Sequence, residues 1–284
     1  MEVNNRSVLA DKICGFKKHL IEQERSQYTI DKYIHDARIF LDFVNDRSIN
    51  KELVIEFKSF LGERYATSSA NSMLAAVNKF LQFIGFTNLR VKPFKMQRVL
   101  FVSEEKELCR DEYIRLIEAA KRQKNERLML IVETICATGI RVSELRFITV
   151  ESVSAGRAEI KCKGKFRTIF LPPKLCRLLK KYTQKQKITA GAVFITRSGK
   201  QLDRSNIWRD MKKLCGLTPI SPKKVFPHNL RHLFARTYYS LEKDLSRLAD
   251  ILGHSNINTT RIYTIESGHI HARQIERLNL VITT

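Results

Sequence analysis

Apolar residues recur at three- and four-residue steps along most of the chain, and this period restricts the fold more than any other feature. Helical patterns of this kind cover residues 23–43, 49–64, 68–84 and 110–137, and they return from residue 205. In the first of these patterns, Thr29 is the expected N-cap. Alternation typical of strands occurs on both sides of Gly164, so residues 157–163 and 166–171 predict a hairpin. Residues 193–196 predict a third strand. The pattern therefore predicts a mainly α chain with a small β-sheet.

A loss of periodicity between residues 85 and 107 divides the chain. This stretch contains Pro93 and mixes basic with acidic residues, which is typical of a linker. A chain of 284 residues is long enough for two domains with separate cores. We therefore predict a helical N-terminal domain at residues 1–90, a linker at 91–108, and a second domain with a C-terminal tail at 109–284.

The net charge of +22 indicates a polyanionic partner, because a field of this size attracts phosphates and releases their counterions. Residues 1–108 hold 17 basic and 14 acidic side chains, whereas residues 109–284 hold 34 and 15. The second domain therefore carries +19 of the charge. Nucleic acid is the partner that we expect first, although a ribosome or an acidic membrane would also attract a net charge of +22.

The cysteines and the N-terminus indicate a reducing, cytoplasmic location without membrane association. The six cysteines lack C-x-x-C pairs and zinc-finger spacing, so disulfides and structural zinc are not expected. The first thirty residues are rich in charge, and no later stretch reaches about eighteen uncharged apolar residues.

Two short motifs place arginines where they can meet a phosphate. In ATGIRVSEL, residues 137–145, Arg141 follows a glycine break, although a surface arginine beside a turn has the same pattern. In PHNLRH, residues 227–232, His228, Arg231 and His232 share one helical face and can converge on one ligand. A zinc site is not favoured there because the glutamate of zinc-hydrolase helices is missing, and a polar helix surface is the plainer alternative.

A third motif follows an amphipathic helix expected at residues 244–252. Gly253 is a natural helix stop, and it holds His254 at the helix end. Beyond it, several N-cap candidates precede a short helix that carries Tyr263. A single tyrosine is usually a packing residue, so this motif indicates a functional site only in combination with the first two motifs.

Taken together, the motifs resemble those of the tyrosine recombinase family, which includes phage integrases and the bacterial Xer proteins. The family order Arg, Lys, His-x-x-Arg, His, Tyr is matched throughout, and Tyr263 stands nine residues after His254 in LGHSNINTTRIY. The resemblance covers residues 109–265. The N-terminal helices, including residues 29–33, resemble the family's smaller core-binding (SAM-like) domain less specifically.

The resemblance implies a fold and a mechanism. The core-binding domain and the α+β catalytic domain are expected to form a clamp around DNA. Tyr263 would attack phosphorus to give a 3′-phosphotyrosine and a free 5′-hydroxyl, so neither ATP nor another cofactor is needed. Arg141 and Arg231 would neutralise the phosphate without a metal, and His254 would donate a hydrogen bond to it. His228 would accept the tyrosine proton or orient a neighbour.

The resemblance also implies a lysine that protonates the leaving 5′-oxygen. Lys163 is the candidate, but the turn is one residue shorter than in the family, and Cys162 stands where glycine is common. Lys165 therefore stays a rival. Glu144, Glu159 and His232 are expected to support the site. Residues 161–187 hold ten Lys or Arg and no acid, which predicts either a solvated basic face or a phosphate-binding one.

The function implied is site-specific recombination at double-stranded core sites, for DNA integration and excision by a mobile element or for Xer-like resolution. Four copies would form a homotetramer in the synaptic complex, with a monomer or weak dimer when free and DNA-bending proteins as accessory partners. No additional arm-binding domain is expected, and the tail at 264–284 would dock on a neighbouring subunit. The alternatives are a noncatalytic DNA-binding protein and a type IB topoisomerase-like enzyme that cleaves strands without exchange.

Overall fold

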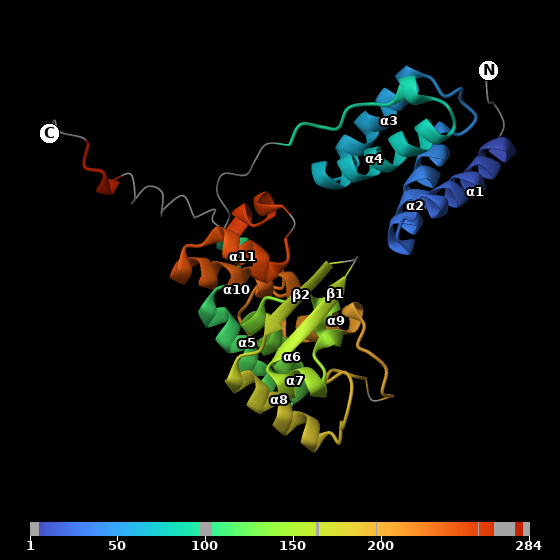
Figure 1. Cartoon of the computed structure of the whole chain (residues 1–284). Coiled ribbons are helices and arrows are strands. Elements are labelled where there is room, and N and C mark those ends of the chain that lie inside the picture. Colours follow the sequence, from blue (N-terminus) through green and yellow to red (C-terminus); the bar gives the residue numbers. More distant parts are fainter. Residues whose placement is uncertain are drawn as a thin grey trace. The chain divides into compact units, whose positions relative to one another are not determined.

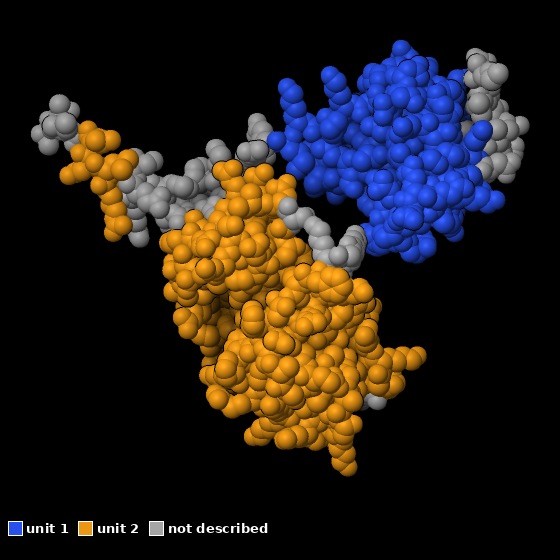
Figure 2. All heavy atoms as spheres, viewed as in Figure 1, with its two compact units in different colours: residues 1–98 blue, residues 99–284 orange. Residues whose placement is uncertain are grey.

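The computed structural model describes residues 6–96, 104–162, 165–196, 198–254, 256–263 and 276–280. The chain divides into two compact units, residues 1–98 and 99–284, shown in blue and orange in Figure 2. Each unit has its own hydrophobic core. The finer division, with a linker at 91–108, stays a prediction.

The first unit consists of helices that bury one apolar face each (Figure 1). Phe16, Phe40, Phe57 and Phe80 are fully buried at its centre. The N-cap of the second helix is Ser26 instead of the expected Thr29, because the Ser26 hydroxyl accepts the Thr29 amide at 3.3 Å. The helices are α1 (Arg6–Glu22), α2 (Gln27–Val44), α3 (Lys51–Arg64), α4 (Thr67–Phe83) and the 3-10 turn η1 (Thr87–Leu89).

The chain that follows η1 is fixed to α4 by two asparagine side chains. Asn78 accepts from the Val91 amide at 3.0 Å and donates to its carbonyl at 2.8 Å. Asn71 pairs with both backbone groups of Phe94 in the same way, at 2.7 and 3.0 Å. Because each amide side chain satisfies one donor and one acceptor, the first part of the expected linker is held extended against the first unit.

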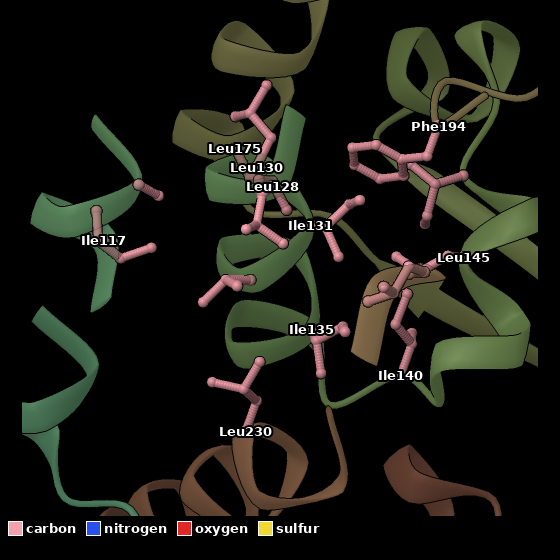
Figure 3. Packing of buried hydrophobic residues seen from close by; sticks show 14 of the residues in the cluster. Ile117, Leu128, Leu130, Ile131, Ile135, Ile140, Leu145, Leu175, Phe194 and Leu230 are labelled. Carbon is pink, nitrogen blue, oxygen red and sulfur yellow. The ribbon is translucent and has the colours of Figure 1, made fainter. Parts of the chain in front are cut away.

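The second unit is built around α6 (Glu126–Thr138), which is central to its core. In Figure 3, α6 contributes Ile131 and Ile135, while Leu175 comes from α8, Leu230 from α10 and Ile140 from the chain after α6. No helix in the described part of the chain is long and apolar enough to cross a membrane. The other elements are η2 (Glu104–Lys106), α5 (Arg110–Arg122), η3 (Val142–Phe147), α7 (Val150–Ala155), α8 (Pro173–Lys185), α9 (Arg204–Cys215), α10 (Pro227–Glu242), α11 (Leu245–Leu252), η4 (Ile257–Thr259) and η5 (Arg261–Tyr263).

The predicted hairpin is present as β1 (Arg157–Cys162) and β2 (Lys165–Phe170), which pair antiparallel with Ile160 opposite Arg167. The expected third strand at 193–196 is wrong: within the described residues the sheet has two strands. The segment makes only isolated bridges, Thr149 with Ala192 and Ile195 with Gln201. Its apolar run has another cause, since Val193 and Phe194 are buried in the core. The mainly α fold with a small sheet is confirmed.

Candidate active site

Arg141 is placed by a tight turn at the end of α6. Gly139 is left-handed, with φ of 65°, and a Cβ there would come within 2.4 Å of the Phe234 ring on α10. Glycine is therefore required both by the backbone and by the close approach of α10. Arg141 then starts η3, where its amide donates to Glu144 at 2.7 Å and its guanidinium forms an ion pair with the same carboxylate at 3.0 Å.

Glu144 is a buried carboxylate that joins three elements. It is only 4% exposed, and its second partner is Arg167 of β2 at 2.5 Å. Arg167 also donates to the Ile251 carbonyl of α11 at 2.8 Å. Glu144 is therefore placed to support the site, because it binds both Arg141 and Arg167. The sequence motifs do not predict Arg167 as a site residue. A signal existed, because Arg167 lies two residues before the buried Ile169 of its strand and so shares its inward face.

Arg231 is a fully buried arginine, 1% exposed, held at the junction of two helix ends. It donates to the Gly139 carbonyl after α6 at 2.5 Å and to the Leu252 carbonyl at the end of α11 at 2.7 Å. Carbonyls at helix C-termini lack intrahelical partners and carry partial negative charge, so they stabilise the guanidinium. Burial, together with the charge of Arg141, lowers its pKa to about 10. Arg231 still carries its charge at neutral pH.

His254 is fixed between Arg231 and Thr260. Its Nε2 lies 3.0 Å from Arg231 Nη2, and its Nδ1 lies 2.8 Å from the Thr260 hydroxyl. A guanidinium can only donate, so Nε2 accepts and Nδ1 carries the proton. Burial and then the Arg231 charge lower the pKa of His254 to about 4, which leaves the ring neutral at pH 7. Thr260, fully buried, is a second positioning residue, although the sequence pattern predicts only a helix cap there.

The chain reaches this position through Gly253, the left-handed C-cap of α11 with φ of 64°. A Cβ on Gly253 would lie 2.7 Å from Cδ of Arg167. The expected helix stop is confirmed, and the glycine also makes room for the arginine that binds Glu144.

Tyr263 lies in the 3-10 turn η5 and is 4% exposed. It packs in a small apolar cluster with Ala235, Leu248 and Leu252. Burial raises the pKa of its phenol, while the charge of Arg231 and a hydrogen bond from it act in the opposite direction. The phenol is therefore protonated at neutral pH, close to the buried cation.

Two histidines of α10 form a row of rings that leads to Tyr263. The His228 and His232 rings are 4.5 Å apart between centroids, and the His232 and Tyr263 rings are 4.9 Å apart. Burial and then His228 lower the pKa of His232 to about 4, and burial and then Arg231 lower that of His228. His232 Nε2 is buried without a hydrogen-bond partner among the described residues. Both rings are therefore neutral proton acceptors at pH 7.

A cleft of about 800 Å³ opens beside this cluster and is lined by Arg141, His228 and Arg231. Its other wall is α9, which the motifs did not single out. Trp208 of α9 is 50% exposed there, although Ile207 and Met211 beside it are buried. The α9 residues that line the cleft share one helical face: Arg204, Ser205, Trp208 and Arg209.

The structure thus brings Arg141, His228, Arg231, His254 and Tyr263 to one cluster, while their chemical roles stay predictions. Lys163 lies outside the described residues, and the side chain of Lys165 in β2 does as well. Most of the tail at 264–284 is likewise outside them. Glu159 does not support the site as expected, since it is exposed beside Ile160 on the opposite face of β1. His228 and His232 have no third metal-ligating residue among those described.

Comparisons with known proteins match both units. Residues 106–268 match the Phage integrase family, and residues 13–85 match the phage integrase N-terminal SAM-like domain. The chain is 29% identical to the tyrosine recombinase XerC of Roseiflexus castenholzii, covering 95% of each chain. It is also 29% identical to the tyrosine recombinase XerD of Staphylococcus epidermidis, covering 91% of this chain and 93% of that one.

The fold of the chain is similar to that of a solved structure. A lambda integrase tetramer bound to a Holliday junction has a TM-score of 0.72 and 18% identity, and the match covers 90% of this chain and 76% of that one. The helical N-terminal unit and the α+β second unit therefore correspond to a known architecture.

Proposed function

Because the chain belongs to the phage integrase family of tyrosine recombinases, we propose that it cuts and rejoins DNA at specific sites through a bond between Tyr263 and a 3′-phosphate. One observation carries the proposal: the Tyr263 ring stacks on that of His254 with centroids 6.2 Å apart, and His254 is hydrogen-bonded to the buried Arg231, which also lines an open cleft. The nucleophile and the cation that would hold its target phosphate are therefore neighbours in one chain.

Two arginines supply the positive charge that phosphate attack requires. The side chain of Arg141 is 42% exposed in the cleft, whereas Arg231 is buried behind it. Attack on phosphorus increases the negative charge on the nonbridging oxygens, and fixed guanidinium groups stabilise that charge best. Glu144 holds Arg141 in place before DNA arrives, so little reorganisation is needed on binding.

Tyr263 must lose a proton to attack. His228 lines the cleft, and His232 lies between it and Tyr263, so the neutral row of rings can take that proton. The oxygen of Tyr263 then bonds to phosphorus while the bond from phosphorus to the 5′-oxygen breaks. Lys163 protonates the 5′-oxygen, which leaves as a hydroxyl. Attack by a 5′-hydroxyl on the phosphotyrosine reverses each step and conserves the bond, so no ATP is consumed.

The proposed role of His254 requires a change of partner. In the structure its Nε2 accepts from Arg231, so it cannot donate to a phosphate there. A bound phosphate would draw the Arg231 donor to itself, and its negative charge would raise the pKa of His254. Nε2 can then carry a proton and donate it in a hydrogen bond, while Nδ1 stays anchored on Thr260.

We further propose that four copies act together on two duplex core sites. A lambda integrase structure with the same fold is a tetramer bound to a Holliday junction, which supports four copies. The free protein would be a monomer or weak dimer, accessory proteins would bend the DNA, and the reaction would take place in the cytoplasm. The sites would serve either DNA integration and excision by a mobile element or Xer-like resolution.

Covalent capture tests the proposal. A nicked duplex carrying the recombination site, obtained by selection from random sequence, should leave a denaturant-resistant protein–DNA adduct even in excess EDTA, since guanidinium groups supply the charge. Loss of the adduct in EDTA, with recovery in Mg²⁺, would contradict metal independence. Tight binding without any adduct would show a noncatalytic DNA-binding protein. Relaxation of supercoils without strand exchange between two sites would show a topoisomerase-like enzyme.

The general acid is tested by two lysine substitutions. Lys163→Ala is expected to slow cleavage about 10²-fold or more, the usual scale for proton transfer, while Lys165→Ala changes it much less. A 5′-bridging phosphorothiolate should rescue Lys163→Ala, because a thiolate leaves without a proton. Rescue of Lys165→Ala instead would show that Lys165 is the general acid. Small and equal effects of the two substitutions on cleavage would show that neither lysine is.

A further inference from the structure

A groove lies between α7 and α8, outside the site described above. Two adjoining hollows of about 560 and 310 Å³ form it, and both are lined by Ser154 of α7 and Lys180 of α8. Arg177 lines the smaller hollow and Lys187 the larger one. Ser154, Gln184 and Thr189 add polar groups. The lining thus combines cations with hydrogen-bonding side chains, the mixture that contacts phosphates in protein–DNA complexes.

The outer face of α8 is strongly basic. The helix buries Leu175, Leu179 and Tyr182 and contains no acidic residue. Of the exposed cations on this face, only Lys185 has a carboxylate within ion-pair distance among the described residues, that of Glu126 at 2.7 Å. The exposed cations of α8 are Lys174, Arg177, Lys180, Lys181 and Lys185, and Lys187 is exposed just beyond its end. Most of this charge is therefore left for a partner.

The groove lies away from the cleavage site within the second unit. Figure 1 shows α8 and α7 at the end of the second unit away from α10 and α11, the helices beside Tyr263. Duplex DNA has a persistence length of about 150 base pairs, so bending one duplex from the cleft round to the groove would cost free energy. A different stretch of DNA could occupy the groove without that bend.

We propose that the α7–α8 groove binds the phosphate backbone of a second DNA duplex segment while the first is held at Tyr263. The proposal rests on the proposed DNA-cleaving function. The cations from Lys174 to Lys185 extend over about 16 Å of helix, the length of about five base pairs of duplex. The basic segment noted at residues 161–187 is thus divided between the hairpin and a separate DNA-binding surface.

The test is capture of a second duplex. Protein is saturated with an immobilised duplex that carries the recombination site, and a fluorescent duplex of unrelated sequence is added over a range of salt. The test variant is Arg177→Gln/Lys180→Gln/Lys187→Gln. We expect capture to fall at least about fivefold and the log–log salt slope to fall by about 2.7, because three phosphate contacts are lost.

The matched control is Arg110→Gln/Arg115→Gln/Arg122→Gln, which removes the same charge from exposed positions of α5 in the same unit. It should keep capture within about twofold, since its cations line neither hollow of the α7–α8 groove. Adduct formation on the nicked site, measured on the same samples, reports the cleavage function separately and should be unchanged in both variants. The proposal is overturned if wild-type protein captures no second duplex, or if both variants lose capture equally. It is also overturned if the groove variant loses binding of polyglutamate but not of DNA, which would mark a protein-docking surface.

Discussion

Tyr263→Phe is expected to abolish covalent attachment to DNA while leaving DNA binding within about twofold. The substitution removes only the phenolic oxygen, and the ring can keep its contacts with Leu248 and Leu252. Without the nucleophile, adduct formation should fall by about 10⁴-fold or more. The stability cost should be at most about 1 kcal/mol, because only the phenolic oxygen is removed and the ring keeps its packing. Denaturing gels of the nicked-duplex reaction and a binding titration measure the two effects.

Tyr238→Phe is the matched control, because Tyr238 packs against the same small apolar cluster as Tyr263. It should leave adduct formation unchanged. An adduct formed by Tyr263→Phe, or peptide mapping of the DNA to Tyr238 or Tyr239, would show that the nucleophile is another residue.

Arg231→Gln is expected to lower both cleavage and stability. A glutamine lacks the charge and cannot reach the Gly139 and Leu252 carbonyls and His254 together, as the guanidinium does. Loss of a charged donor aimed at the transition state should slow single-turnover cleavage by about 10³-fold or more. Two buried carbonyls left without partners should cost about 2–5 kcal/mol of unfolding free energy. Single-turnover kinetics at saturating DNA and urea denaturation measure the two changes.

Arg141→Gln separates these two effects. Arg141 is half-exposed, and Glu144 keeps Arg167 as its buried partner when Arg141 is replaced. We expect a comparable loss of cleavage but a stability change of at most about 1 kcal/mol, as for other exposed ion pairs. If Arg141→Gln destabilised the protein as much as Arg231→Gln, or if Arg231→Gln cleaved normally, the assignment of Arg231 as the buried phosphate ligand would be wrong.

The sequence alone determined the local structure and singled out the candidate site residues. The pairing of β1 with β2 and the end of α11 at Gly253 follow from period and turn chemistry, which act over a few residues. His228 and Arg231 share a face because a helix repeats every 3.6 residues. The expected strand at 193–196 failed because an apolar run shows that Val193 and Phe194 are buried but not which backbone pairs with them.

Only the tertiary structure decided how these residues support one another. Arg231 and Gly139 are 92 residues apart in the chain, and Arg167 and Ile251 are 84 apart, so no local pattern could place them in contact. The same is true of Trp208, whose exposure beside the cleft depends on how α9 packs. Burial of these groups then sets their chemistry, since removal from water keeps His254 neutral and the Tyr263 phenol protonated. Desolvation depends on everything that surrounds a side chain, and that is a property of the packed fold.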